Sequence, residues 1–352
     1  MPYRLSCQRI LGPEHLTPSD PRLKVVGAFN PGAAMLGDET ILLVRVVEQV
    51  IDDRDDAEAS PRYVPGQGLT IDWLPVEDLA YEDPRVYRDR HTGFERLRFI
   101  SHLKVVRSTD GRTVSDDLAG PAILPTTAYE TYGIEDPRIT RIGDVYYITY
   151  VGVSPHGVAT CLMSTRDFIS FERHGIIFPP ENKDVLLFPE RIAGDYVAMH
   201  RPVPLMQMRP PEMWIAHSPD LIHWGRHQHL LGATRHWERS RIGGGTPPIR
   251  TPRGWLSLYH ASERREGDTG PGAYTAGALL LDLENPRRVL AQAHDPVMRP
   301  REDWERQGFV NDVVFPTAMI EHDQQLWVYY GAADCATAVA VFDQADILAM
   351  LK

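Results

Sequence analysis

Short runs of apolar and aromatic residues, each bounded by Gly, Pro, Asp or Asn, recur along the whole chain. Their lengths and their alternating or fully apolar patterns predict β-strands rather than helices. The clearest are Thr40–Val47, Val145–Val151, Tyr196–His200, Trp255–His260 and Leu326–Tyr330. Long helical patterns are scarce, and only Phe342–Lys352 predicts a short helix. The sequence therefore predicts an all-β fold.

The predicted strands repeat as larger units, each with an x-Pro pair, a short apolar segment, a turn and an aromatic-rich strand. The prolines recur 52–68 residues apart, at Pro31, Pro84, Pro137, Pro189, Pro248 and Pro316. A period just above fifty with one aromatic strand per unit is typical of propeller blades. Because the units share one pattern, we expect residues 1–352 to form a single β-propeller domain, with each proline at the start of an innermost strand.

A second signal recurs between these prolines. Ser101–Gly111, Cys161–Phe171 and Trp214–Trp224 each combine an apolar strand with a Ser and, two or three residues later, an Asp. Such side chains close turns by binding backbone N–H groups. We predict an outer strand followed by a Ser/Asp turn in each of these units.

Composition narrows the classes of function. Over 352 residues the chain carries 37 basic and 48 acidic side chains, a net charge of −11, and 43% hydrophobic residues. Such a charge disfavours nucleic acid and anionic membrane surfaces as partners. No apolar run approaches the roughly 20 residues of a spanning helix, and the first residues lack a signal-peptide pattern. We therefore expect a soluble cytoplasmic protein without nucleic-acid or membrane partners.

Nothing in the sequence predicts a metal site. The three cysteines are far apart and lack ligand spacing. The histidines at 217, 223, 227 and 229 lie in a segment that is predicted as strand and turn, where their spacing does not suit a metal. Gly243–Gly245 precedes two prolines and no helix, so it is not a phosphate-binding P-loop. These glycines instead suggest close approach of backbone to a ligand.

In a propeller, the residues beside the repeated prolines surround the central channel, where ligands usually bind. The sharpest motif there is Gly133–Arg138 (GIEDPR). Asp136 and Arg138 are two residues apart and share a strand face, so an acid and an anion-binding group can meet over one pocket. The same tetrapeptide is also typical of a solvated ion pair in a turn. The tetrapeptide EDPR occurs a second time, at Glu82–Arg85. Only one of the two copies can supply a single general acid.

Basic residues surround the next repeat. Lys183 precedes it, and His200 and Arg201 end its aromatic strand. Phosphate or sugar hydroxyls would suit these groups, although strand ends are often polar without a function.

Together these motifs resemble glycoside hydrolase family 130. The resemblance rests on GIEDPRIT, NKDVLLFPERIAGDYVAMHRP, SPDLIHW, RIGGGTPPIRTPRGWLSLYHA, NDVVFPTAMI and YYGAAD, and it runs from about Gly27 to Asp334. The family contains β-mannoside phosphorylases and some β-1,2-mannosidases on a five-bladed β-propeller. It therefore implies five blades despite six prolines. The stretch 51–98 is longer than the family implies, so we expect an insertion in the first blade region.

The resemblance also implies residue roles. Asp136 matches the general acid, which in the phosphorylases acts through a hydroxyl of the bound mannose. Asn30, Arg45 and Asp334 match residues that hold mannose, and His102 stands where some phosphorylases have arginine in the substrate site. Phosphate ligands are expected at Arg138, Lys183, His200 and Tyr274.

These matches predict an inverting phosphorylase that cleaves β-1,2- or β-1,4-mannooligosaccharides with inorganic phosphate and releases mannose 1-phosphate. Phosphate would be a co-substrate, and no other cofactor is expected. A phosphorylase needs cations for a dianion, whereas an inverting hydrolase needs a second carboxylate for water.

Two alternatives remain open. One is an inverting β-1,2-mannosidase, with its base at Glu190, Glu212 or Glu238. The other is a glycan-binding propeller without activity, in which Asp136 only binds sugar. A mannose-containing oligosaccharide is the expected partner in every case, and homo-oligomerisation also stays open.

Overall fold

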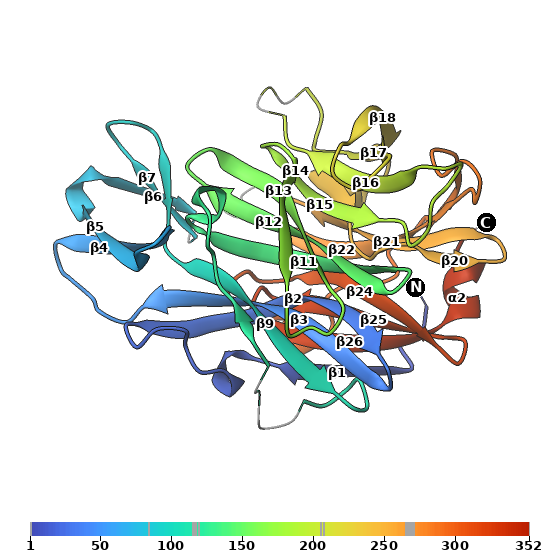
Figure 1. Ribbon diagram of the computed structural model, residues 1–352, viewed down its shortest axis with the longest axis horizontal. Coiled ribbons are helices and arrows are strands. Elements are labelled where there is room, and N and C mark those ends of the chain that lie inside the picture. Colours follow the sequence, from blue (N-terminus) through green and yellow to red (C-terminus); the bar gives the residue numbers. More distant parts are fainter. Residues whose placement is uncertain are drawn as a thin grey trace.

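The computed structural model describes residues 2–83, 85–114, 118, 120–204, 206, 208–264 and 272–351, without the side chains of Glu82 and Asp83. Strands form most of this structure, and four large sheets make up its body (Figure 1). Each of the five clearest predicted strands lies within an observed strand, so the all-β prediction is confirmed.

The largest sheet has two halves. The first contains β2 (Leu23–Leu36), β3 (Glu39–Val50), β9 (Ile100–Ser108) and β10 (Ala122–Ile123). The second contains β11 (Gly133–Ile142), β12 (Val145–Ser154), β13 (Gly157–Thr165) and β14 (Glu172–Phe178). A single parallel bridge between Ser101 and Gly133 joins them. Each half is therefore a nearly separate four-stranded unit with antiparallel pairing.

Two further sheets follow in chain order. The first contains β15 (Asn182–Leu187), β16 (Tyr196–Pro202), β17 (Met213–Ser218) and β18 (Gly225–Leu231). The second contains β19 (Arg241–Gly244), β20 (Ile249–Thr251), β21 (Gly254–Glu263), β22 (Ala273–Leu281) and β23 (Val289–Gln292).

The last sheet joins the two ends of the chain. It contains β24 (Val314–His322), β25 (Gln325–Ala332) and β26 (Ala336–Asp343). Its fourth strand is β1 (Ser6–Leu11), which pairs antiparallel with β26. Two short helices lie next to this sheet in the chain. They are η1 (Pro13–His15), which follows β1, and α2 (Gln344–Ala349), which follows β26 and lies within the segment Phe342–Lys352 that was predicted to be helical.

The hydrophobic core is divided among the interfaces between successive sheets. Representative buried pairs are Leu103 with Ile148, Leu162 with Leu187, Leu186 with Trp255, Leu258 with Val328, and Val44 with Val339. In this order each unit packs on the next, and the last packs back on the first. Burial of apolar surface thus holds the units together in a cycle.

A buried glutamate recurs in three of the units. Glu130, Glu238 and Glu305 lie in η3 (Ala128–Glu130), η4 (His236–Glu238) and α1 (Asp303–Arg306). Each carboxylate accepts two backbone N–H groups at the start of its turn and one tyrosine hydroxyl. The tyrosines are Tyr150, Tyr259 and Tyr330. This repeated contact fixes the turn before a sheet to a central strand of that sheet.

The repeated prolines correct one expectation. Pro31, Pro137 and Pro316 lie inside β2, β11 and β24, at register shifts, and not at strand starts. A bulge leaves a residue outside the hydrogen-bond ladder, so proline, which has no N–H, is tolerated there. The residues before two of these prolines, Asn30 and Asp136, have positive φ angles of 50° and 51°.

The predicted side-chain turns are present after β9, β13 and β17. Asp110, Asp167 and Asp220 each accept two backbone N–H groups of the following turn. The partner hydroxyl in the second turn is Thr165 rather than Ser164. β13 and β17 are not outermost, because β14 and β18 pair beyond them.

Residues 51–99 leave the first sheet and return to it, since β3 and β9 pair directly. They contain two small sheets, one of β4 (Ala57–Val64) and β5 (Gly68–Pro75), and one of β6 (Leu79–Asp83), β7 (Val86–Asp89) and β8 (Glu95–Leu97). The short turn η2 (Val76–Asp78) connects them. This excursion projects from the left of the molecule in Figure 1. Of the first EDPR copy, only the Arg85 side chain is described.

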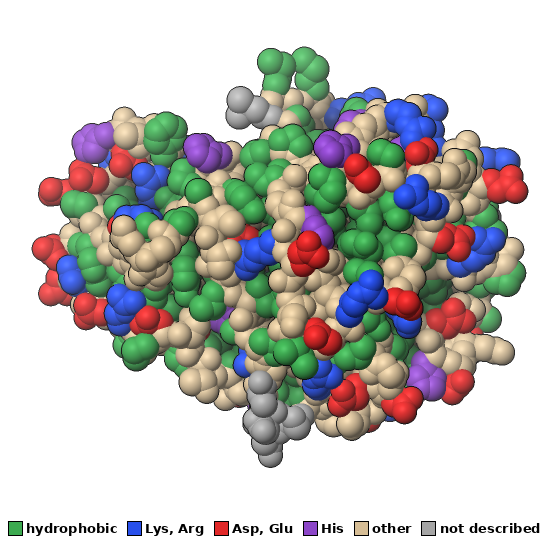
Figure 2. Space-filling model, viewed as in Figure 1, with side chains coloured by type: hydrophobic (Ala, Val, Ile, Leu, Met, Phe, Trp, Pro, Cys, Tyr) green, Lys and Arg blue, Asp and Glu red, His purple; other side chains and the backbone are tan. Residues whose placement is uncertain are grey.

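Acidic and basic side chains are interspersed over the face seen in Figure 2, without a broad patch of one sign. No helix within the described ranges is long and apolar enough to cross a membrane.

Candidate active site

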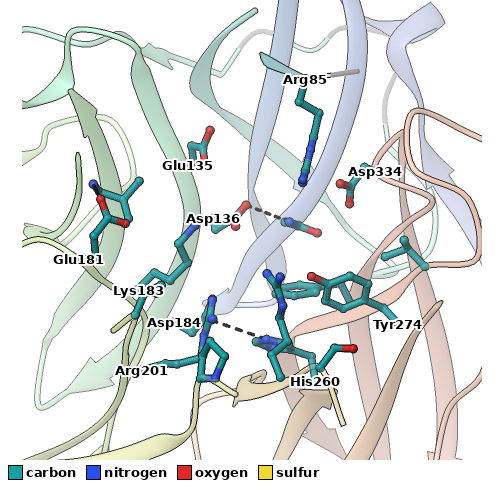
Figure 3. Close-up of a pocket in the computed structure, with 18 of the residues that line it drawn as sticks. Arg85, Glu135, Asp136, Glu181, Lys183, Asp184, Arg201, His260, Tyr274 and Asp334 are labelled. Carbon is teal, nitrogen blue, oxygen red and sulfur yellow. Dashed lines mark hydrogen bonds and ion pairs between the residues drawn. The ribbon is translucent and has the colours of Figure 1, made fainter. Parts of the chain in front are cut away.

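A cavity of about 1050 Å³ opens where β2, β3, β11, β15, β16, β19 and β21 converge, and part of the excursion also lines it. Figure 3 shows Glu135, Asp136 and Asp334 on one side of this cavity and Lys183, Asp184, Arg201 and His260 on the other. The pocket therefore has a mainly acidic side and a mainly basic side.

Asp136 reaches the pocket through the bulge in β11. Its positive φ of 51° turns the side chain out of the strand's alternation. One carboxylate oxygen, Oδ1, accepts hydrogen bonds from Asn30 Nδ2 at 2.9 Å and from an Arg45 guanidinium nitrogen at 3.1 Å. Oδ2 has no protein partner among the described residues, so it is available to a ligand.

The charge of Asp136 is set by its neighbours. Burial favours the neutral acid, but the guanidinium groups of Arg45 and Arg138 and the amide of Asn30 outweigh it. Together they hold the pKa of Asp136 below its usual value. Asp136 is therefore ionised at neutral pH in this structure.

Arg45 links two carboxylates of the pocket. Its guanidinium lies 2.6 Å from Glu135 Oε1 and 3.1 Å from Asp136 Oδ1. Its Nε atom is buried without a hydrogen-bond partner, as is Oδ1 of Asn30. Unpaired buried donors and acceptors are costly unless a ligand satisfies them. A sugar, which offers several hydroxyl groups, fits this pair.

Asp334 follows β25 and completes the acidic side of the pocket, with a positive φ of 47°. Burial is the main cause that raises the pKa of Asp334 to about 6, and the charges of Asp136 and Glu135 add to it. Arg45 and Arg85 act in the opposite direction. Arg85 comes from the excursion and points toward Asp334 (Figure 3).

The basic side of the pocket is organised around Asp184. Asp184 has a positive φ of 58° and lies at a register shift in β15. Its carboxylate lies 2.7 Å from Arg201 Nε, 3.7 Å from His260 Nε2 and 3.9 Å from a guanidinium nitrogen of Arg138. The positive charges of Arg201, Arg138 and Lys183 hold the pKa of Asp184 well below its usual value despite burial. Asp184 is thus an anion that orients a cationic cluster.

Lys183 has no salt bridge or hydrogen bond among the described residues, although its side chain lines the pocket. Burial, followed by repulsion from Arg201, lowers the pKa of Lys183. Arg138, Lys183 and Arg201 carry three positive charges around the single charge of Asp184. A dianion would neutralise the remainder.

His260 faces the same cluster from β21. Burial lowers the pKa of His260 to about 3, so the imidazole is neutral. Its Nδ1 lies 3.1 Å from the Gly244 carbonyl oxygen and must donate there, because a carbonyl only accepts. Nε2 is then an acceptor. Phe315 stacks on the ring, and Tyr274 lies beside it.

The structure brings most of the predicted site residues together. Asp136, Asn30, Arg45 and Asp334 line one side of the cavity, and Lys183 and Tyr274 line the other. Arg138 lies beneath the wall, where it donates to the carbonyl oxygens of Asp136 and Gly245.

Two predicted histidines lie outside the cavity lining. His102 is buried near Glu48, with Nε2 3.6 Å from a carboxylate oxygen. His200 is stacked on Phe178, and its Nε2 lies 3.2 Å from His227 Nδ1. Its neighbour Arg201 points into the cavity, because successive strand residues face opposite ways. In this structure neither histidine contacts the cavity that the resemblance assigned to it.

The three glutamates considered as hydrolytic bases are also outside the lining. Glu190 pairs with Arg250, Glu212 pairs with His229, and Glu238 is the buried carboxylate of η4. The glutamates that do line the cavity are Glu95, Glu135 and Glu181.

Sequence reasoning did not assign a role to His260, Asp184 or Arg241, all of which line the cavity. His260 ends an aromatic strand in one repeat as His200 does in another, so this equivalence was a usable signal. In the described part of the chain, no group of three His, Cys, Asp or Glu side chains is arranged to hold a metal ion.

Comparison with known proteins agrees with this geometry. Residues 86–352 match the family model of glycoside hydrolase family 130, described as beta-1,4-mannooligosaccharide phosphorylase. Beta-1,2-mannobiose phosphorylase of Listeria innocua is 39% identical, over 99% of this chain and 98% of its own. A 1,2-beta-oligomannan phosphorylase of Thermoanaerobacter sp. is 37% identical, over 71% of this chain and 81% of its own.

Solved structures extend the comparison to three dimensions. The Listeria innocua enzyme in complex with beta-1,2-mannobiose matches with a TM-score of 0.91 at 38% identity, covering 99% of both chains. A more distant structure, at 19% identity and a TM-score of 0.71, shares the fold. These likenesses place the protein among the carbohydrate-active enzymes. The chain belongs to glycoside hydrolase family 130.

Proposed function

We propose that the enzyme cleaves β-1,2-linked mannobiose and short β-1,2-mannooligosaccharides with inorganic phosphate, and releases mannose 1-phosphate with inversion. The observation that carries the proposal is the cationic cluster of Lys183, Arg201 and Arg138 beside Asp136. The β-1,2 linkage rests on the Listeria innocua and Thermoanaerobacter relatives, whose names specify it.

Phosphate would bind between Lys183, Arg201 and His260. Lys183 has an unpaired ammonium group there, and three cations surround one carboxylate. Nε2 of neutral His260 would accept a hydrogen bond from the hydroxyl group of a hydrogen phosphate ion. Mannose would occupy the opposite side, where Asn30, Arg45 and Asp334 offer unpaired donors and acceptors.

The reaction then proceeds by one displacement. A phosphate oxygen attacks the anomeric carbon, the glycosidic bond breaks, and the leaving oxygen takes a proton that originates from Asp136. The hydrogen phosphate ion gives up its own proton as it becomes the sugar phosphate dianion, and this proton returns to Asp136, so the reaction balances. Asp136 must be protonated first, although Arg45 and Arg138 favour its ionised form. A bound dianion offsets these cations, so phosphate binding raises the pKa of Asp136 and prepares the acid.

We also propose that the fold is a five-bladed β-propeller. Five units follow each other along the chain, four of them with four strands and one with five, and hydrophobic clusters join each to the next and the last to the first. In this arrangement β1 completes the fifth unit, and residues 51–99 are an insertion in the first. The catalytic cavity would be the mouth of the central channel.

The function is tested by incubating the enzyme with β-1,2- or β-1,4-mannobiose, with and without phosphate, and measuring mannose 1-phosphate and free mannose. We expect mannose 1-phosphate from the β-1,2 substrate and dependence on phosphate. Lys183→Met should raise KM for phosphate by about 10–100-fold, the loss of one charge-assisted contact, with little change in KM for mannobiose. Lys24→Met, on an exposed surface, is the matched control.

Free mannose at an equal rate in phosphate-free buffer would contradict the proposal and favour the mannosidase. Binding of mannobiose without any turnover would favour a glycan-binding protein.

A further inference from the structure

The face of β15 and β16 that points away from the cavity carries a buried polar pair. Lys183 and Arg201 are cross-strand partners in these two strands, and both line the cavity. Successive strand residues face opposite sides, so their neighbours Asn182 and His200 lie on the reverse face. Only 7% of Asn182 and 3% of His200 is exposed. Neither residue lines the cavity, so the reaction described above gives no role to either.

A hydrogen bond joins Asn182 to His200, and further contacts hold the imidazole in place. Asn182 Nδ2 lies 3.0 Å from His200 Nδ1, and because an amide N–H donates, Nδ1 is the acceptor. The proton of the ring is then on Nε2, which donates to His227 Nδ1 at 3.2 Å. Phe178 stacks on the ring, with 4.7 Å between the centroids. Burial lowers the pKa of His200 to about 3, so this imidazole is neutral and adds no charge.

Backbone pairing holds Lys183 over only a short length of strand. β15 begins at Asn182, and its register against β16 shifts between Lys183 and Leu186, so two residue pairs precede the bulge. Asp184 lies inside this shift, where the regular ladder is interrupted. The side-chain bond between Asn182 and His200 therefore ties the two strands together where their backbone pairing is short.

Lys183 and Arg201 need such a tie because they repel each other. After burial, the charge of Arg201 is the main cause that lowers the pKa of Lys183. Both cations must nevertheless stay close enough to bind one phosphate ion. A neutral hydrogen bond behind the strands restrains them without adding charge, and cations that are already in position lose less free energy when the anion binds.

We propose that Asn182 and His200 are positioning residues: their hydrogen bond fixes the spacing of Lys183 and Arg201 and so prepares the site for inorganic phosphate. The proposal rests on the phosphorylase function given above. It replaces the direct phosphate contact that the family resemblance implied for His200 by an indirect role, exerted through the neighbouring Arg201.

The test compares His200→Phe, Asn182→Leu and the double variant in the phosphorolysis of β-1,2-mannobiose. Phe keeps a ring against Phe178 and Leu keeps the volume of Asn, but each removes the hydrogen bond. We expect either single variant to lower kcat/KM for phosphate about 5–10-fold, the loss of one buried hydrogen bond, with KM for mannobiose within about twofold of wild type. Because both changes remove the same bond, the double variant should be no worse than the larger single effect. His200→Gln, whose amide can still accept from Asn182, should recover most of the efficiency.

His174→Phe is the matched control. His174 is partly buried on β14, and its Nε2 lies 2.8 Å from Ser164 Oγ, so this change also replaces a hydrogen-bonded histidine, but outside the cavity. Its kcat/KM for phosphate should stay within about twofold of wild type. Thermal melting curves identify any variant that misfolds, and Asn182→Leu tests the same bond if His200→Phe does not fold.

Each other outcome overturns the inference. Equal phosphate kinetics in His200→Phe and His174→Phe would remove the role, and equal losses for phosphate and mannobiose would make the bond a general support of the fold. Additive losses in the double variant would show that the two residues act separately. Losses in His200→Phe and His200→Gln without any in Asn182→Leu would make His200 a phosphate ligand. Wild-type enzyme that forms no mannose 1-phosphate would contradict the proposed function instead, so the two failures are distinguishable.

Discussion

Individual backbone conformations position the chemistry of this site. Asn30, Asp136, Asp184 and Asp334 all have positive φ angles, between 47° and 58°. This region is unfavourable for most residues, but Asn and Asp adopt it more readily than others. Three of the four lie at register shifts or strand ends, so each leaves the strand ladder and turns its polar group into the cavity. These backbone conformations are unfavourable in themselves, but they bring the four polar side chains together in one site.

At this scale, Asp136→Asn tests the general acid. The amide keeps the shape and the hydrogen bond to Arg45 but cannot supply a proton. We expect turnover to fall by about 10²–10⁴ while the melting temperature changes little. The measurement is the initial rate of mannose 1-phosphate formation. Asp83→Asn, in the first EDPR copy, is the control and should be mild. A larger effect of Asp83→Asn would exchange the roles of the two copies.

Asp334→Asn should separate function from stability. The pKa of Asp334 is raised to about 6, so ionisation of this carboxyl disfavours the folded state. The cost is absent below the unfolded pKa near 4, grows as pH rises, and is complete above pH 6. The variant should therefore be about 1–3 kcal/mol more stable than wild type at pH 8, and equal to it at pH 4.

Its catalytic efficiency should nevertheless fall at least about tenfold, because a mannose contact is lost. Urea unfolding at both pH values, with an activity assay, tests both expectations. A variant that is less stable at pH 8 would contradict the account of this charge.

At the scale of elements, β19 shows how a strand shapes the site without any side chain. The sequence suggested that Gly243–Gly245 let backbone approach a ligand. In the structure, Gly243 and Gly244 instead admit the side chains of His260, Asp184 and Leu186. The glycines therefore leave room for the side chains that we propose bind phosphate.

Gly243→Ala should disrupt this arrangement. Its Cβ atom would lie 2.8 Å from both Asp184 Oδ2 and His260 Nε2, which is closer than real contacts allow. The cluster must shift, so we expect KM for phosphate to rise by about tenfold or more while KM for mannobiose changes less. Gly225→Ala, with nothing within 4 Å and no positive φ, is the control. Equal phosphate kinetics in both variants would show that β19 is not a constraint on the cluster.

At the scale of the whole molecule, the N-terminal and C-terminal segments of the chain pack together in one sheet. β1 pairs with β26, and Arg4 lies 2.6 Å from the buried carboxylate of Glu305, which also accepts the Tyr330 hydroxyl. Removing one partner of a buried ion pair leaves an uncompensated charge. The N-terminal residues therefore contribute to the stability of the sheet that β24, β25 and β26 form.

Arg4→Met should lower the free energy of unfolding by about 3–5 kcal/mol. Urea denaturation followed by tryptophan fluorescence measures it, and kcat of the folded enzyme should remain near wild type. Arg9→Met is the matched control, because its partner Glu14 is half exposed and such pairs contribute little. If the free energy of unfolding of Arg4→Met falls by less than about 1 kcal/mol, the pairing of β1 with β26 does not depend on this ion pair.

The strands, the Ser/Asp turns, the C-terminal helix and the EDPR motif that contains Asp136 could all be predicted from the amino-acid sequence. These features are local: they depend on alternation, turn chemistry and spacing within a few residues. The repeated prolines marked only three strands, β2, β11 and β24, and they lie there at bulges rather than at strand starts, whereas Pro189 and Pro248 follow β15 and β19.

Which side chains share the cavity depends on how the sheets pack and could not be predicted from the sequence. His200 and Arg201 are neighbours on β16 and face opposite ways, and alternation alone does not say which of them faces inward. Packing of Phe178 on His200 and of Asp184 on Arg201 settles it. His260, Asp184 and Asp136 come from separate sheets, so their meeting depends on how those sheets pack. A pattern within one strand contains no information about that contact.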